Sequence, residues 1–120
     1  MTSDEGVDFA DNFPFLAHQQ PRPGQIDMIR ESRESLKLQG FHLCAAPTGI
    51  GKTAASLAAA IEVLRNSSTK INILFLTGRQ SQHKIVVDTI RKINDRIAGQ
   101  YQPVKVVDII GREYMCEVVD

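Results

Sequence analysis

The stretch AAPTGIGKTA is the part of the sequence whose residue types and spacing most clearly suggest chemistry. Gly49 and Gly51 let backbone N–H groups approach phosphate oxygens closely, and the N-terminus of a following helix adds a partial positive charge. Lys52 can reach the β and γ phosphates of a nucleotide, and the Thr53 hydroxyl can bind Mg²⁺. The usual pattern begins with glycine where this chain has Ala46. The stretch predicts a nucleotide-phosphate loop, against the alternative of a chance glycine-rich turn.

A glutamine lies upstream of this loop, in RPGQIDMI, at the start of a predicted helix. The side-chain amide of Gln25 can donate and accept hydrogen bonds at once, which matches the N6 donor and N7 acceptor of adenine. The alternative is an exposed polar residue near a helix N-terminus. Gln25 is therefore a candidate for reading the base.

Polar residues also follow the phosphate loop along the chain, in FLTGRQSQ. Thr77, Arg79 and Gln82 lie where a predicted strand ends and a helix begins. Hydroxyl, guanidinium and amide groups at this place suit contacts with a sugar-phosphate backbone. The alternative is a polar turn in which Ser81 caps the helix.

Hydrophobic periodicity indicates the elements that would position these groups. Helices are predicted where apolar residues recur at helical spacing, namely Ile26, Ile29 and Leu36, then Leu57, Ile61 and Leu64, then Val86, Ile90, Ile93 and Ile97. The apolar runs FHLCAA, INILFL and VKVVDII are predicted strands, and Cys44 in the first of them is expected to be a small buried residue. Alternating strands and helices predict an α/β fold, a parallel sheet with flanking helices.

Composition bounds the class of protein. At 120 residues with 42% hydrophobic residues, the chain is expected to form one domain, with a flexible tail over residues 1–12. It holds no apolar run of membrane-spanning length, and its acidic start resembles neither a secretory signal nor a transit peptide. We expect an intracellular protein, in the cytoplasm or nucleoid, or in the nucleus of a eukaryote. The net charge of zero neither favours nor excludes nucleic acid, and the histidines and cysteines have no zinc-site spacing.

The motifs together resemble a known family. APTGIGKT resembles the phosphate loop of superfamily two helicases, in which alanine at the first position is ordinary. In those enzymes RPGQIDMI matches the adenine-reading Q motif, and FLTGRQSQ matches motif Ia, which holds single-stranded DNA. The ordered set FPF, RPGQIDMI, APTGIGKT, FLTGRQSQ and GREYMC resembles the N-terminus of XPD-type iron–sulfur helicases, relatives of the bacterial DinG helicases. The resemblance covers nearly everything after residue 12.

This resemblance implies a partial RecA-like P-loop domain over residues 13–110 and the start of an iron–sulfur insertion over 111–120. The full-length protein would be an ATP-dependent 5′–3′ DNA helicase that uses ATP, Mg²⁺ and a [4Fe–4S] cluster and binds single-stranded DNA. The implied roles are phosphate binding by Thr48, Gly49, Gly51 and Lys52, Mg²⁺ binding by Thr53, adenine binding by Gln25, DNA contacts by Thr77, Arg79 and Gln82, iron ligation by Cys116, and support of the cluster or DNA by Arg112. Without a second motor domain, these residues alone are expected to bind nucleotide weakly and to hydrolyse little of it.

Two other classes stay open at this point. Asp108 follows an apolar run and could hold Mg²⁺ as a Walker B aspartate, which would make the chain a small stand-alone P-loop NTPase or kinase. Ile109 follows it, however, where a glutamate would activate water. The other alternative is a module that binds nucleotide without catalysis.

Overall fold

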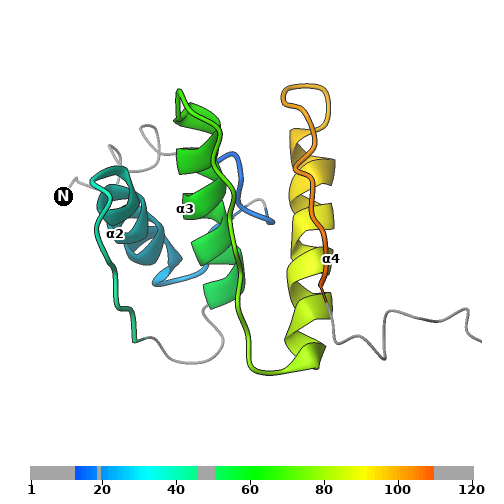
Figure 1. Ribbon diagram of the computed structural model, residues 1–120, viewed down its shortest axis with the longest axis horizontal. Coiled ribbons are helices and arrows are strands. Elements are labelled where there is room, and N and C mark those ends of the chain that lie inside the picture. Colours follow the sequence, from blue (N-terminus) through cyan, green and yellow to red (C-terminus); the bar gives the residue numbers. More distant parts are fainter. Residues whose placement is uncertain (1–12, 19, 46–50, 110–120) are drawn as a thin grey trace, which may run out of the picture.

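Three α-helices form the frame of the part of the chain that the computed structural model describes, residues 13–18, 20–45 and 51–109 (Figure 1). They are α2 (Gln25–Lys37), α3 (Lys52–Asn66) and α4 (Gln80–Ile97). Helix α2 packs closely against α3, whereas α3 and α4 make few direct contacts. Both α3 and α4 begin at the lower end of the molecule as drawn in Figure 1. All three helices were predicted from apolar periodicity, and the structure confirms them.

Each helix forms for a recognisable local reason. Helix α2 follows a turn in which Gly24 adopts a positive φ of 89°, and its inner face buries Ile29 completely. Helix α3 is rich in alanine, the best helix former, and its small side chains let it pack closely against α2. The predicted apolar face of α4 is buried at all four of its positions, Val86, Ile90, Ile93 and Ile97.

The segment 13–18 joins the three helices into one core. Phe13, Phe15, Leu16 and Ala17 are all buried in it. Arg33 of α2 lies over the ring of Phe13, Arg65 of α3 lies over the ring of Phe15, and Arg96 of α4 donates to the carbonyl oxygen of Leu16. Because α3 and α4 make few direct contacts, this segment supplies much of the packing between them (Figure 1).

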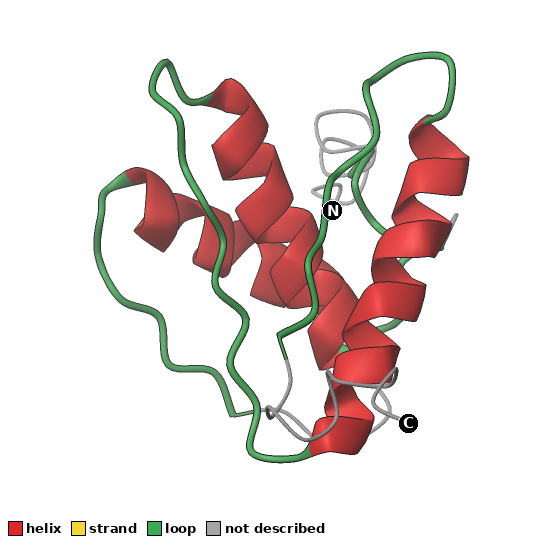
Figure 2. Ribbon diagram, turned by 45° about the vertical axis from the view of Figure 1, so that its right-hand side comes forward, coloured by secondary structure: helices red, strands yellow, loops and turns green. Residues whose placement is uncertain are grey.

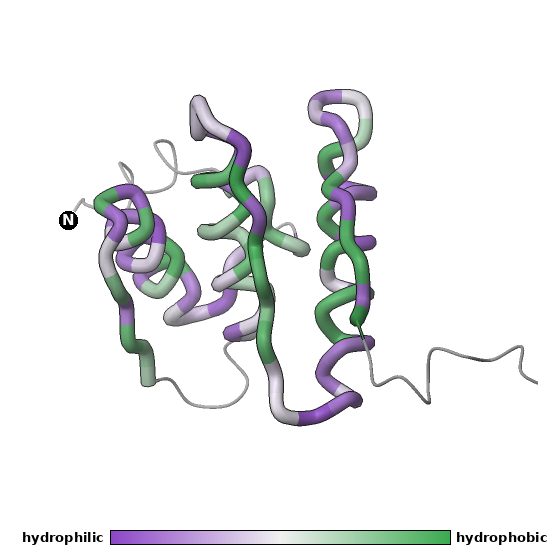
Figure 3. Tube along the Cα trace, in the orientation of Figure 1, coloured by the Kyte–Doolittle hydropathy of each residue, from purple (hydrophilic) through white to green (hydrophobic). Residues whose placement is uncertain are grey.

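The predicted parallel sheet is wrong. Within the described residues no segment is a β-strand, and Figure 2 shows only helices and loops there. The three predicted strands are extended, but they form no hydrogen-bonded ladder. Their apolar side chains also remain largely exposed, for example Leu43 at 97%, Leu76 at 80% and Val107 at 82%. Figure 3 shows these apolar stretches running along the outside of the helices.

The physical reason is that the extended segments are kept apart by the helices: in Figure 1 the segment after α3 passes in front of α3, and the segment after α4 runs along α4. Helices pack about 8–10 Å apart, roughly twice the 4.7–4.9 Å that separates paired strands. Segments carried on different helices are therefore too far apart to exchange backbone hydrogen bonds. The predicted strands are therefore wrong together with the sheet in which they were expected to pair.

Two smaller expectations concern burial and the membrane. Cys44 is exposed, so the expectation of a buried cysteine is also wrong, and for the same reason: no sheet covers its segment. None of the described helices is long and apolar enough to cross a membrane. The predicted tail at 1–12 and the predicted insertion at 111–120 lie outside the described residues.

Candidate nucleotide and nucleic-acid site

The N-terminus of α3 carries the two residues expected to contact phosphate and Mg²⁺. Helix α3 begins at Lys52, directly after Gly51, which has a left-handed conformation with φ 79° and ψ 55°. Gly51 has no side chain with which to cap the helix, and the first turn contains no acidic residue. Backbone N–H groups at such an end, together with the helix dipole, favour an anion. Thr48 and Gly49 lie outside the described residues.

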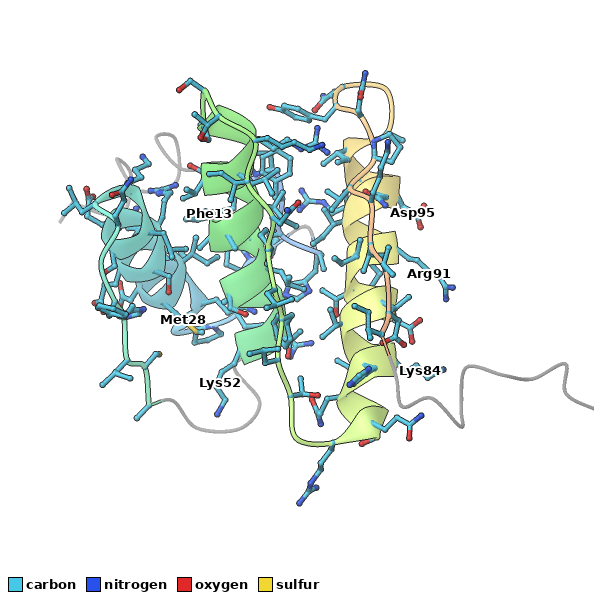
Figure 4. The ribbon with its side chains drawn as sticks, in the orientation of Figure 1. Phe13, Met28, Lys52, Lys84, Arg91 and Asp95 are labelled. Atoms are coloured by element: carbon cyan, nitrogen blue, oxygen red, sulfur yellow. The ribbon has the colours of Figure 1, made fainter. Side chains whose placement is uncertain are left out.

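Lys52 and Thr53 differ in exposure. Lys52 is exposed, and its side chain points away from the helices at their lower end (Figure 4). Thr53 is half-buried on the first turn, where its carbonyl oxygen accepts a hydrogen bond from the Ser56 hydroxyl at 3.1 Å. The first turn of α3 therefore offers an ammonium group and a hydroxyl beside uncapped backbone amides, a donor set that fits a Mg²⁺-bound polyphosphate.

Gln25 is fully buried and makes hydrogen bonds through both ends of its side-chain amide. Its oxygen accepts from the backbone N–H of Arg22 at 2.8 Å and lies 3.2 Å from Nε2 of His18. Its nitrogen donates to the carbonyl oxygen of Gly51 at 3.0 Å. The alternative of an exposed polar residue is therefore wrong, because the side chain of Gln25 links α2 to the start of α3.

The contact between Gln25 and Gly51 leaves no room for a side chain at position 51. A Cβ atom added to Gly51 would lie 2.4 Å from the amide nitrogen of Gln25. Position 51 therefore requires glycine for two reasons: its left-handed backbone conformation, and the absence of a Cβ atom that would collide with the Gln25 amide.

The residues predicted to contact DNA lie at the start of α4. The Thr77 hydroxyl donates to the carbonyl oxygen of Arg79 at 2.9 Å, and the backbone N–H of Gln82 donates to the same oxygen at 3.1 Å. Arg79 is the N-cap residue and is exposed, and no side chain caps the helix, so the proposed Ser81 cap is absent. Because α3 and α4 begin at the same end of the molecule, the structure brings this segment and Lys52 to one end (Figure 4).

Sequence reasoning missed two sets of contacts near this site. His83 on the first turn of α4 pairs with Asp108, with Nδ1 2.6 Å from a carboxylate oxygen. His18 and Arg96 surround Gln25 and the segment before it. No periodicity or motif in the sequence indicates either set of contacts.

The described residues contain no group of three or more His, Cys, Asp or Glu side chains that could hold a metal ion. Of the residues expected to bind iron or support the cluster, Arg112 and Cys116 lie outside the described part of the chain. The described residues thus contain no ligand set for a cluster.

Comparison with known proteins gives a family match over most of the chain. A family model described as type III restriction enzyme, res subunit, matches residues 18–110, which include α2, α3 and α4. No curated protein matches the chain, and no solved structure matches it either. The matched region contains the buried Gln25, the helix that opens with Lys52, and the segment from Thr77 to Gln82. The chain belongs to the family of type III restriction enzyme res subunits and carries, over residues 18–110, a helicase superfamily two N-terminal module.

Proposed function

We propose that this chain forms the ATP-binding start of a DNA helicase that moves 5′ to 3′ along single-stranded DNA. Membership of a helicase family supports ATP-dependent motor function in general. The observation that carries the proposal is the start of α3, where Lys52 and Thr53 follow an uncapped, left-handed Gly51 whose carbonyl oxygen is bound by Gln25. The proposed 5′ to 3′ direction of movement and the preference for single-stranded DNA rest on the resemblance to XPD-type helicases.

The nucleotide roles follow from the donors at this end of α3. Thr48, Gly49, Gly51 and Lys52 would hold the phosphates, and Thr53 would bind Mg²⁺, which supplies charge neutralisation during phosphoryl transfer. Gln25 would read adenine with the amide hydrogen that Gly51 does not use. Its oxygen already accepts from Arg22 and faces His18, so the contact with adenine that this arrangement leaves open is donation to N7.

The nucleic-acid roles belong to the start of α4. Thr77, Arg79 and Gln82 would contact the sugar-phosphate backbone, and exposed Arg79 is the charged member of the set. Arg112 would contribute to the same strand or support a cluster, and Cys116 would be the first of four thiolate ligands of a [4Fe–4S] cluster. These last two roles rest on the resemblance of GREYMC alone, and equal amounts of bound iron and acid-labile sulfide in the purified protein would support them.

The central experiment measures Mg²⁺-dependent ATP binding and hydrolysis by the full-length helicase that the proposal assumes, with and without single-stranded DNA. Lys52→Ala should lower turnover by about 100-fold or more, because it removes a positive charge from the transferred phosphates. Lys70→Ala is the matched control, since Lys70 is an exposed lysine in the turn after α3. Equal turnover in Lys52→Ala and wild type would contradict the proposal.

The same assays separate the two alternative functions. A stand-alone NTPase or kinase that uses Asp108 for Mg²⁺ would lose its activity in Asp108→Asn. The helicase proposal expects a small effect, because a carboxylate oxygen of Asp108 is engaged by His83 at 2.6 Å. A non-catalytic module would bind ATP and show no turnover under any condition, including with single-stranded DNA present.

A further inference from the structure

His18 stands next to the buried amide of Gln25, seven residues away in the chain. Its Nε2 atom lies 3.2 Å from the amide oxygen of Gln25, which also accepts from the backbone N–H of Arg22. A carbonyl-type oxygen can only accept, so Nε2 of His18 must carry the hydrogen. The half-buried imidazole is therefore a donor in this contact.

The N–H of Arg22 and the carbonyl oxygen of Gly51 define which way the Gln25 amide points, and His18 adds a second donor to the amide oxygen. With its oxygen facing His18 and Arg22, its nitrogen faces the carbonyl oxygen of Gly51 at 3.0 Å. A rotation of the amide by 180° would place its NH₂ group against the backbone N–H of Arg22 and its oxygen against the carbonyl oxygen of Gly51. Since Gln25 is fully buried, water cannot compensate for such mismatches. His18 thus stabilises the orientation in which Gln25 holds Gly51.

Helix α4 holds the backbone of His18 in turn. One guanidinium nitrogen of Arg96, on the last turn of α4, donates to the carbonyl oxygen of Leu16 at 2.6 Å and to that of His18 at 2.9 Å. The carbonyl oxygen of Gly51 also accepts from the backbone N–H of Ala55 at 3.0 Å, the first hydrogen bond of α3. A continuous set of hydrogen bonds therefore runs from α4 through His18 and Gln25 to the first turn of α3.

We propose that His18 is a positioning residue for the nucleotide site, which orients the Gln25 amide so that Gly51 and the first turn of α3 are held in a phosphate-binding arrangement. The inference rests on the proposed function, because it assumes that nucleotide binds at the start of α3. His18 acts through Gln25 and needs no contact with the nucleotide. Its loss therefore weakens nucleotide binding without removing any phosphate ligand.

The test compares the affinity for Mg·ATP of wild type, His18→Leu and His18→Gln, measured by titration calorimetry. Leucine removes the donor, and the dissociation constant should rise about five- to tenfold, the effect of one lost hydrogen bond. Glutamine carries an N–H donor at a similar reach, so His18→Gln should stay within about twofold of wild type. His42→Leu is the matched control, because His42 is also a half-buried histidine but is hydrogen-bonded to Ser32, with its Nδ1 2.8 Å from the serine hydroxyl oxygen.

Each outcome decides between the inference and the proposed function. If wild type binds Mg·ATP and His18→Leu binds it equally well, the positioning role is wrong while the proposed function stands. If His42→Leu weakens binding as much as His18→Leu, or if His18→Gln does not restore it, the effect is one of general stability and the inference also fails. If neither wild type nor Lys52→Ala binds Mg·ATP, the proposed function itself fails.

Discussion

At the scale of single residues, the most constrained position is Gly51. Its positive φ of 79° is unfavourable for any residue with a Cβ atom, and that atom would lie 2.4 Å from the amide nitrogen of Gln25. Gly99 shares the first constraint without the second, because its φ is 90° and nothing lies within 4 Å of an added Cβ. The two glycines allow backbone strain to be separated from the contact with Gln25.

Gly51→Ala should therefore cost more stability than Gly99→Ala. The change at Gly99 should lower the free energy of unfolding by about 1 kcal/mol, the cost of left-handed alanine. The change at Gly51 should lower it by about 2–3 kcal/mol, because it also displaces the buried amide of Gln25. Denaturant unfolding followed by circular dichroism measures both values.

Gly78→Ala is the reference for this pair, since no atom lies within 4 Å of its added Cβ and its φ is not positive. It should change the free energy of unfolding by less than about 0.5 kcal/mol. Equal costs at Gly51 and Gly99 would show that the Gln25 amide moves aside freely, against the packed arrangement described for it.

At the scale of elements, α4 shows how one helix serves two purposes. Its inner stripe is buried, with Ile93 at 0% and Ile97 at 1% exposure, while its first turn carries the residues proposed to contact nucleic acid. Burial of the stripe fixes the rotation of the helix about its axis. This rotation in turn decides which first-turn side chains face solvent at the end shared with Lys52.

Two isoleucines of α4 give a matched pair for the burial argument. Ile93→Ala should lower the free energy of unfolding by about 2–4 kcal/mol, because it removes buried methyl groups and leaves a cavity. Ile85→Ala should lower it by under about 1 kcal/mol, since Ile85 is 45% exposed. Both variants make the same change in helix propensity. Thermal and denaturant unfolding should agree, and equal losses would contradict the assigned orientation of α4.

The sequence predicted the helices well because a helix that faces a core repeats its apolar residues every three to four positions. It predicted the residues at the start of α3 because the loop motif places them there directly. It failed for the sheet because a short apolar run such as INILFL indicates burial or extension without indicating a partner. The sequence also could not predict the hydrogen bonds that connect His18 through Gln25 to Gly51, because they form between separate elements.

At the scale of the whole molecule, side chains of the helices replace the missing sheet for two of the three extended segments. His42 ties its segment to α2 through Ser32 at 2.8 Å. Asn94 of α4 binds both backbone groups of Val104, accepting from its N–H at 2.7 Å and donating to its carbonyl oxygen at 3.1 Å. The first segment is thus anchored at His42. The second is anchored at a few separate points, namely Gln102 by Arg65, Val104 by Asn94 and Asp108 by His83, and the residues between them expose apolar side chains to solvent.

Point anchoring predicts an uneven pattern of amide hydrogen exchange over residues 102–109. The amide of Val104 should exchange about five- to tenfold more slowly than those of Val106 and Val107, because only the first has a hydrogen-bond partner in the described part of the chain. Asn94→Ala should remove this protection and leave the exchange of α4 amides nearly unchanged. Asp95→Ala is the control, since Asp95 is exposed on the next position of the same helix. Equal, strong protection from Val104 to Val107 in the wild type would mean that this segment pairs along its whole length, and would contradict the anchored arrangement.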